Sequence, residues 1–119
     1  ERELGIDAEK IRPDFGGEDI AERYFSEKEQ KELREVPDEL RATAFFLCWT
    51  RKEAYIKAHG DGLQIPLASF DVSLTPGKPE MLQSSDKQRW SLRSFTPAPG
   101  YTAAIITEGK LPCIRFWER

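Results

Sequence analysis

A tryptophan, a carboxylate and an ammonium recur at four-residue spacing in the stretch from Trp49 to Ala58. Trp49, Glu53 and Lys57 would share one stripe of a helix, because residues four apart stack on the same helical face. This pattern has two interpretations. It can be a solvent-facing ion pair that stabilises the helix by about 0.3–0.5 kcal/mol. It can also be part of a metal or phosphate site, in which the tryptophan marks where the stripe turns inward.

A second pair of acids lies near the start of the chain. Residues 4–9 read as a short strand, with Asp7 and Glu9 on one face and the apolar residues Leu4, Ile6 and Ala8 on the other. Two carboxylates two residues apart on one strand face repel each other unless a positive group lies between them. The strand therefore either ends in solvent or holds its acids around a cation.

Composition bounds the class of protein. The chain has 119 residues, enough for one small domain with a single core, and its 39% hydrophobic content is that of an ordinary globular protein. The net charge of −3 and the alternation of acids and bases argue against a nucleic-acid binder with a basic face. No apolar run approaches the ~20 residues that cross a bilayer, and the first residues do not form a signal peptide, so we expect a cytoplasmic protein.

The inventory of reactive residues excludes some catalytic classes. His59 is the single histidine and lies at the end of the expected helix, which leaves no material for a Ser/His/Asp or Cys/His relay. Cys48 and Cys113 lie in apolar patterns without the spacing of metal ligands. We expect both to be buried free thiols rather than a disulfide.

Helical patterns occupy the first half of the chain. A short helix is predicted over residues 18–24, and a second begins at a capping box of Ser26 and Glu29 and runs to about residue 35. Asp38 is the expected N-cap of a long third helix that ends at Gly60. Its apolar positions cover much of the helix circumference, which predicts a central helix; they are Leu40, Ala44, Leu47, Ala54 and Ala58, widened by Phe45, Phe46, Trp49, Tyr55 and Ile56.

Past Gly62 the period changes from helical to alternating. Strands are predicted over residues 69–74, 80–83, 88–95, 101–107 and 112–117, separated by short turn-rich links. Strands that follow one another through short links pair antiparallel. The expected fold is α+β: an antiparallel sheet of about five strands packed against a long central helix, forming a single domain over residues 1–119.

Three ordered blocks together resemble the 4'-phosphopantetheinyl transferase superfamily, in its Sfp-type branch. Residues 5–9 resemble that family's strand G-I/V-D-x-E, and residues 25–29 are similar to its F-S/T-x-x-E segment. Residues 49–63 resemble its signature W-S/T-x-K-E-A/S-F/Y-x-K-x-x-G-x-G-L. The likeness covers roughly residues 4–74. Ala8 departs from the pattern, since a larger aliphatic residue is usual there, but the acids are retained.

The resemblance implies a transferase. Such an enzyme moves the 4'-phosphopantetheine arm of coenzyme A onto a serine of an acyl or peptidyl carrier protein and releases adenosine 3',5'-bisphosphate. Carried over from the family, Asp7, Glu9 and Glu53 hold Mg²⁺, and Lys57 contacts the phosphates of coenzyme A. Glu53, directly or through a metal-bound water, is the candidate base for the serine hydroxyl.

The reading of the residues agrees with this assignment. Mg²⁺ takes hard oxygen ligands and is typically shared with substrate phosphates, and three carboxylates brought together need a cation to relieve their repulsion. Arg51 and Lys52 match the signature only loosely and are either phosphate-side or structural.

The chain is about half as long as the Sfp-type enzymes that it resembles. Sfp-type enzymes are built from two similar halves with coenzyme A between them, whereas this chain has the length of one half and begins at the strand that opens the second. We expect the C-terminal half of a two-half enzyme; the alternative is a stand-alone half that forms a homo-oligomer. Either way, much of the adenine and phosphate pocket would come from residues outside this chain. The alternative function is a non-catalytic half-domain that acts as an interaction module.

Overall fold

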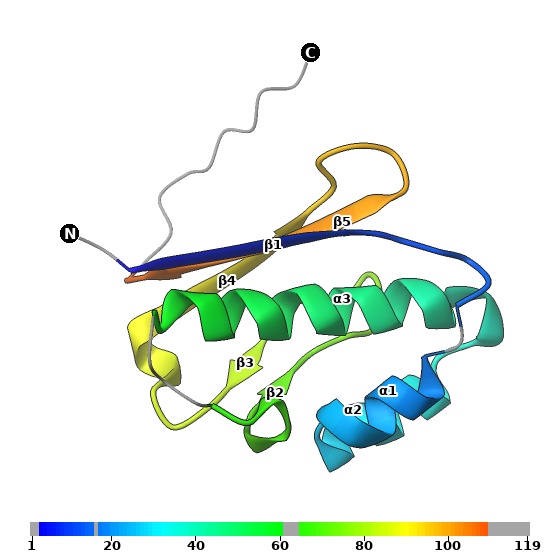
Figure 1. Cartoon of the computed structure of the whole chain (residues 1–119), viewed down its shortest axis with the longest axis horizontal. Helices are drawn as coiled ribbons and strands as arrows, with labels where there is room; N and C mark the ends of the chain where they lie inside the picture. Colours follow the sequence, from blue (N-terminus) through cyan, green and yellow to red (C-terminus); the bar gives the residue numbers. More distant parts are fainter. Residues whose placement is uncertain (1–2, 16, 61–64, 110–119) are drawn as a thin grey trace.

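One long helix runs through the middle of the molecule and separates two layers (Figure 1). The computed structural model describes residues 3–15, 17–60 and 65–109. The elements are β1 (Leu4–Lys10), α1 (Glu18–Tyr24), α2 (Glu27–Glu35), α3 (Asp38–Ala58), β2 (Asp71–Val72), β3 (Leu82–Gln83), β4 (Trp90–Phe95) and β5 (Tyr101–Glu108), with short 3-10 turns η1 (Leu67–Ser69) and η2 (Lys87–Arg89). The long helix is α3.

The described strands form two antiparallel sheets. A three-stranded sheet has the order β1-β5-β4, and β2 pairs with β3 separately. In Figure 1 the larger sheet lies above α3, while β2, β3, α1 and α2 lie below it. The predicted α+β class with an antiparallel sheet and a long helix is confirmed, but the described strands are divided between two sheets. The strand predicted over residues 112–117 lies outside the described residues.

The predicted central position of α3 is confirmed. Ala44, Ala54 and Ala58 are completely buried, and Phe45 and Phe46 are buried beside them. Small alanine side chains let the sheet approach the helix closely, while the aromatic residues fill the opposite layer. Leu40, predicted in the buried stripe, is 38% exposed because it lies in the first turn of the helix.

The helix starts differ from one another. The capping box of α2 is confirmed: Glu29 N donates to Ser26 Oγ at 3.2 Å, and Ser26 N donates to Glu29 Oε1 at 2.8 Å. The prediction that Asp38 caps α3 is wrong, since the N-cap position is Pro37 and no side chain caps it. The Asp38 carboxylate instead forms an ion pair with Arg41, with 2.6 Å between Asp38 Oδ1 and Arg41 Nη1.

Cys48 is a free, buried thiol, as predicted, and burial raises its pKa well above the ordinary value. Cys113 lies outside the described residues. Within the described ranges, no helix is both long and apolar enough to cross a membrane.

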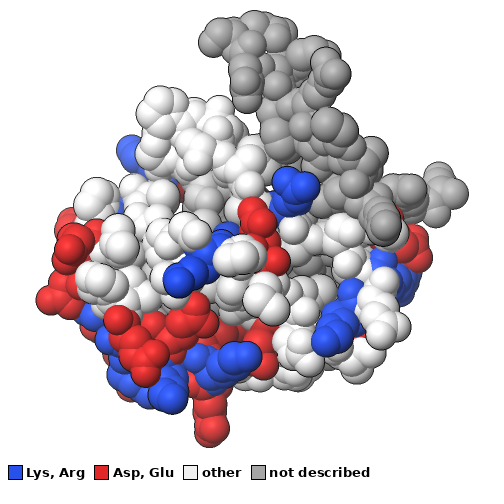
Figure 2. Space-filling view, turned by 180° about the vertical axis from the view of Figure 1, so that it is seen from behind, with Lys and Arg blue, Asp and Glu red and all other residues white. Residues whose placement is uncertain are grey.

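Charged side chains of both signs are interleaved on the surface. Figure 2 shows them gathered most densely at the end of the molecule that α1 and α2 form, while much of the face above them carries no charge. This face therefore presents a mixed charge distribution rather than a single basic or acidic patch.

Candidate active site

Gly5 brings the acids of β1 against the long helix. A Cβ atom at this position would lie 2.0 Å from the carbonyl oxygen of Ala54 and 2.4 Å from the backbone nitrogen of Ala58, so only glycine fits. Alternate residues of a strand share a face, so Asp7 and Glu9 face α3 as Gly5 does. The side chain of Asp7 is 9% exposed. The acids therefore lie on a packed face and not on a strand end in solvent.

Asp7 forms an ion pair with Lys57. The Lys57 Nζ lies 2.8 Å from Asp7 Oδ1 and 3.4 Å from the carbonyl oxygen of Ile6. Lys57 thus forms its ion pair with a residue of β1. A solvent-facing ion pair on the helical stripe would instead have joined Lys57 to Glu53. Its side chain is 51% exposed, so solvent reaches the ammonium group.

The second oxygen of Asp7 differs from the first, since it lacks a partner within the part of the chain that the structure describes. Asp7 Oδ2 is buried and accepts no hydrogen bond from any described residue. A buried carboxylate oxygen without a donor is costly, because it has lost its water and gained nothing in exchange. This atom therefore marks a place where a cation would stabilise the fold.

Glu53 and Glu9 carry raised pKa values. Burial is the main cause of the raised pKa of Glu53, and the negative charges of Asp7 and Glu9 add to it, while Lys57 opposes it. Burial and then the charge of Asp7 raise the pKa of Glu9, against the opposing charges of Lys57 and Arg12. The three acids therefore form one electrostatic cluster, with Lys57 as a shared counter-charge.

These acids do not form a closed ligand set. Within residues 3–15, 17–60 and 65–109, no three His, Cys, Asp or Glu side chains converge closely enough to hold a metal ion. The predicted metal ligands Asp7, Glu9 and Glu53 therefore stay a prediction. Two observations fit a hard cation at this place: the unpartnered oxygen of Asp7 and the mutual repulsion of the acids.

Two cations of the same helix serve the fold. The fully buried Lys52 donates to Glu29 Oε2 at 2.8 Å. Arg51 donates from Nε to Ser94 Oγ at 2.7 Å and from Nη1 to the carbonyl oxygen of Ser73 at 2.6 Å. Both side chains tie α3 to other elements, which decides between the phosphate-side and structural alternatives in favour of the structural one. Neither charged group is engaged with the acids of β1.

Trp49 packs among aromatic rings. Its indole stacks on Phe45, with centroids 6.2 Å apart and planes 10° apart, and meets Tyr24 edge-on at 6.2 Å. Along the stripe of Trp49, Glu53 and Lys57, the aromatic surroundings of Trp49 are thus followed, within two helical turns, by the charged cluster.

A small cavity of about 150 Å³ lies beside Glu9. Arg12 and aromatic side chains, including Phe15 and Trp49, line the rest of it. The Arg12 guanidinium lies 4.7 Å from the centre of the Phe15 ring. Sequence reasoning missed Arg12, and its only signal was its position three residues after Glu9. Arg12 adds a second cation next to the acid cluster.

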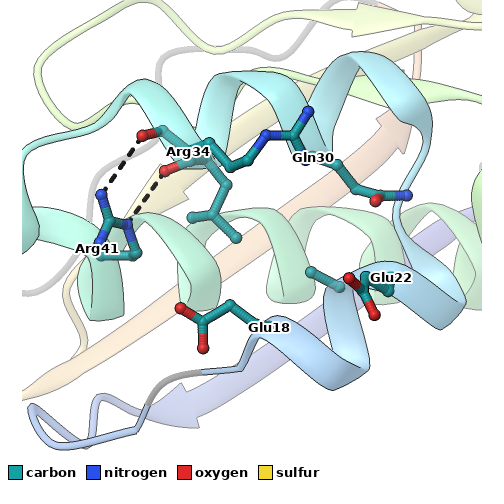
Figure 3. A pocket seen from close by; sticks show the side chains of 7 residues that line it. Glu18, Glu22, Gln30, Arg34 and Arg41 are labelled. Carbon is teal, nitrogen blue, oxygen red and sulfur yellow. Dashed lines mark hydrogen bonds between the residues drawn. The ribbon is translucent and has the colours of Figure 1, made fainter.

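Larger cavities lie elsewhere. One of about 360 Å³ lies between α1 and α2, and Figure 3 shows Glu18 and Glu22 on one side of it and Gln30 and Arg34 on the other. Another, of about 400 Å³, adjoins His59. None of the four predicted site residues lines either cavity. The candidate site is thus a partly open surface cluster and not the largest hollow of the described residues.

The sequence of residues 3–106 matches the family model of the 4'-phosphopantetheinyl transferase superfamily. The chain belongs to this superfamily. The matched range includes Asp7, Glu9, Glu53 and Lys57, so the strand and helix that meet at the candidate site both lie within the family domain.

Curated relatives are longer than this chain. It is 40% identical over 117 residues to the 4'-phosphopantetheinyl transferase HetI of Nostoc sp., a match that covers 98% of this chain and 48% of that protein. It is 32% identical over 103 residues to the 4'-phosphopantetheinyl transferase Sfp of Bacillus subtilis, covering 86% and 45% respectively. The chain therefore spans about half the length of the curated relatives it matches.

Solved structures share the fold. A coenzyme A complex of the synthase ACPS from Chronobacterium ammoniagenes has a TM-score of 0.65 at 19% identity, covering 90% of this chain and 96% of that one. The holo-[acyl-carrier-protein] synthase of Thermotoga maritima has a TM-score of 0.63 at 22% identity, covering 91% and 63%. At these identities the likeness shows the fold alone.

Proposed function

We propose that this domain is part of a 4'-phosphopantetheinyl transferase that acts on coenzyme A and on a serine of an acyl or peptidyl carrier protein. One observation carries the proposal: the packing of Gly5 on α3 assembles Asp7, Glu53 and Lys57 in one cluster within a domain of this family. In the reaction, the serine oxygen forms a bond to the β-phosphorus of coenzyme A. The bond from that phosphorus to adenosine 3',5'-bisphosphate breaks.

The acid cluster suits a magnesium ion. Asp7, together with Glu9 and Glu53, would hold Mg²⁺, and the bound ion would offset the negative charge of the pyrophosphate. The support from this chain is the unpartnered Asp7 Oδ2 and the raised pKa values of both glutamates, caused by burial and by neighbouring carboxylates.

Glu53 is the proposed base for the serine hydroxyl. Burial and the nearby acids raise its pKa, and a carboxylate with a raised pKa takes up a proton more readily than an ordinary one. The proton of the serine hydroxyl would move to Glu53 as the new oxygen–phosphorus bond forms.

Lys57 is the proposed phosphate ligand. Its ammonium group is half exposed and now held by Asp7. It would leave Asp7 and donate to a phosphate oxygen of coenzyme A, for which a lysine serves as a point charge. A cation that takes over the charge of Asp7 would free the ammonium group for the phosphate, so phosphate binding and metal binding would support each other.

The proposed partner is the other half of a two-half enzyme. The face of the larger sheet away from α3 carries Leu4 and Ile6, which are 55% and 48% exposed. Ile105 lies beside Ile6 in the strand register, and Arg93 lies on the other side of Ile105. Because the chain spans about half of its curated relatives, we propose that the half outside this chain covers this face. A homo-oligomer is the alternative occupant.

The test is transfer of a labelled coenzyme A arm to apo carrier proteins in the presence of Mg²⁺. The enzyme is a hybrid chain that joins the N-terminal half of the Nostoc relative to this domain, and the Nostoc relative itself is the positive control. We expect the hybrid to transfer the arm and the Glu53→Gln variant to lose about 100-fold or more in kcat/KM, the range for a general base. The control Glu39→Gln removes an exposed acid from the first turn of α3 and should leave the rate unchanged.

The alternative function, a non-catalytic interaction module, has one observation in its favour: the described acids do not converge as a three-ligand metal site. It predicts that the hybrid binds a carrier protein, that no arm is transferred with Mg²⁺ present, and that Glu53→Gln leaves the binding unchanged. This result, with an active positive control, would overturn the transferase proposal.

A further inference from the structure

A carboxylate from outside the long helix, that of Asp86, contacts the end of α3. Asp86 Oδ1 accepts hydrogen bonds from Tyr55 Oη at 2.5 Å and from Ser84 Oγ at 3.0 Å. Asp86 Oδ2 accepts one from Trp90 Nε1 at 2.9 Å and lies 3.0 Å from His59 Nε2. One carboxylate therefore joins two residues at the end of the helix to the connection between β3 and β4.

The main donors to this carboxylate keep their protons at neutral pH. The indole N–H of Trp90 can only donate. Burial, followed by the hydrogen bond to Asp86, raises the pKa of Tyr55 to about 12, so its hydroxyl stays protonated. Burial acts to raise the pKa of Asp86, but the hydrogen bonds that it accepts, above all from Trp90 and Tyr55, outweigh burial and hold this pKa well below its usual range. The contacts therefore hold without any change of charge.

The donors are buried, whereas Asp86 reaches the surface. The side chains of Tyr55 and Trp90 are 4% and 7% exposed, and that of Asp86 is 33% exposed. The His59 ring packs against both donors, with its centre 4.3 Å from that of Tyr55 and 4.9 Å from that of Trp90. A buried donor that loses its acceptor is costly. The end of α3 is therefore tied to the place where Asp86 lies.

The last turn of a helix needs such an anchor more than its middle does. Helix ends fray, because their last carbonyl groups lack a donor from a following turn. In α3 the amides of His59 and Gly60 close the last turn, donating to the carbonyl oxygens of Ile56 and Lys57 at 3.2 and 3.1 Å. The ion pair of Lys57 with Asp7 adds little hold on this turn, since the lysine is half exposed.

The anchor and the candidate site lie on different sides of the helix. Tyr55 and Lys57 are two residues apart in the sequence, which places them about 200° apart around the helix axis. Asp86 therefore holds the end of α3 from one side, while Asp7 of β1 meets it from nearly the opposite side. A loss of the anchor would let the last turn open on the side away from β1.

We propose that Asp86 is a positioning residue for Lys57. By anchoring Tyr55 and His59, it keeps the last turn of α3 formed. That turn holds Lys57 opposite Asp7, where the proposed function needs the ammonium group to meet the phosphates of coenzyme A. The anchor itself concerns the fold, and its consequence for coenzyme A rests on the proposed function. Asp86 lies outside the three motif blocks, and the signature takes F or Y at the position of Tyr55, so the anchor is a feature of this chain's own sequence.

The first test measures amide hydrogen exchange by NMR in the 119-residue chain at neutral pH. The amides of His59 and Gly60 report whether the last turn is formed. We expect Asp86→Ala to lower their protection about tenfold, because the turn loses its anchor. Asp86→Asn should restore most of the protection, since its amide can accept from Trp90 and donate to the hydroxyl of Tyr55.

Two further variants sharpen this result. Tyr55→Phe removes one donor and keeps that of Trp90, so the loss of protection should be smaller than in Asp86→Ala. The matched control Asp38→Ala removes an aspartate that is 88% exposed in the first turn of the same helix, and protection at Gly60 should stay unchanged. Unchanged protection in folded Asp86→Ala would overturn the anchor. If Asp86→Ala does not fold, unchanged protection in Tyr55→Phe would overturn it.

The second test measures the KM for coenzyme A in the hybrid two-half chain. Only molecules with a formed last turn would present Lys57 to the phosphates, so Asp86→Ala should raise this KM about threefold to tenfold. The kcat should change less than about twofold, because Asp86 does not touch the reacting atoms. Asp86→Asn and the control Asp38→Ala should both stay near the wild-type KM.

The two tests separate the inference from the proposed function. A hybrid of wild-type sequence that transfers no arm would overturn the proposed function, and the exchange measurement would still decide the anchor. An active hybrid whose KM for coenzyme A is the same with Asp86→Ala, although protection of the last turn has fallen, would overturn the positioning role of Asp86.

Discussion

Lys57 belongs to two interactions that compete for one ammonium group. In the structure it neutralises Asp7, at 2.8 Å, and the other oxygen of that carboxylate has no partner among the described residues. In the proposed function it binds a phosphate. In that proposal a cation beside Asp7 would take the place of the lysine and free its ammonium group, so the ion pair is the arrangement of the metal-free chain.

Glu53→Gln should stabilise the metal-free chain at neutral pH. Burial and the charges of Asp7 and Glu9 raise the pKa of Glu53 above the ordinary 4.5. A raised folded-state pKa gives stability that is present below the ordinary pKa and is lost as the pH rises through the folded-state value. Neutral glutamine avoids this loss, so the free energy of unfolding near pH 7 should rise. The gain should stay below about 1 kcal/mol, because water screens a half-buried group.

Urea unfolding in a chelating buffer measures this difference. The gap between Glu53→Gln and the wild type should be largest near pH 7 and should close at about pH 3.5, where the wild-type carboxyl group is protonated in both states. A variant that is less stable than the wild type near pH 7 would show that Glu53 is stabilised by its neighbours, contrary to the electrostatics of the cluster.

At the scale of elements, the candidate site depends on how closely β1 and α3 approach. Three features allow the contact: Gly5 on the strand, and Ala54 and Ala58, completely buried, on the helix. The contact places the acids of the strand opposite the charged end of the helical stripe. The buried pair of Lys52 and Glu29 holds the helix from its other side.

Gly5→Ala should therefore destabilise the chain by about 3 kcal/mol, since the new methyl group would meet backbone atoms that cannot move aside without separating the strand from the helix. Thermal and urea unfolding measure the loss. The matched control is Ala8→Val, which enlarges an exposed side chain on the opposite face of the same strand and should change stability by less than about 0.5 kcal/mol. Equal effects of the two substitutions would contradict the close contact.

At the scale of the whole molecule, one face of the larger sheet is packed on α3 and the other displays Leu4 and Ile6. Exposed aliphatic side chains next to one another on a sheet are typical of a surface that a partner covers. Because the chain spans about half the length of its curated relatives, the partner that we propose is the other half of a two-half enzyme.

Ile6→Asp should distinguish a covered face from a bare one. In the isolated chain the residue is 48% exposed, and the substitution should cost less than about 0.5 kcal/mol. In the hybrid two-half chain the same carboxylate would be buried among apolar groups, and the free energy of unfolding should fall by about 2 kcal/mol or more. Leu40→Asp, at a site 38% exposed on α3, is the control and should have the same small effect in both chains.

Equal effects of Ile6→Asp in both chains would mean that the second half does not cover this face. Sedimentation of the isolated chain over a range of concentrations would then test the homo-oligomer, since a self-associating chain becomes larger as its concentration rises.

The sequence by itself determined the features that depend on neighbours along the chain. The bounds of α1, the capping box of Ser26 and Glu29 and the central position of α3 follow from local spacing, which a helix repeats every 3.6 residues. The three motif blocks likewise identified the family, because their residues lie in a defined order. The predicted cap at Asp38 failed for a local reason too, because Pro37 occupies the N-cap position and Asp38 is already the first residue of the helix.

Only the tertiary structure decided which distant side chains meet. Lys57 forms an ion pair with Asp7 and not with Glu53, and the buried Lys52 pairs with Glu29. Near the end of α3, the hydroxyl of Tyr55 donates a hydrogen bond to Asp86. Such pairs depend on where backbones cross and how closely they pack, and no periodicity encodes this. The pairing of the strands is decided in the same way, because β1 pairs with β5 from the other end of the described chain.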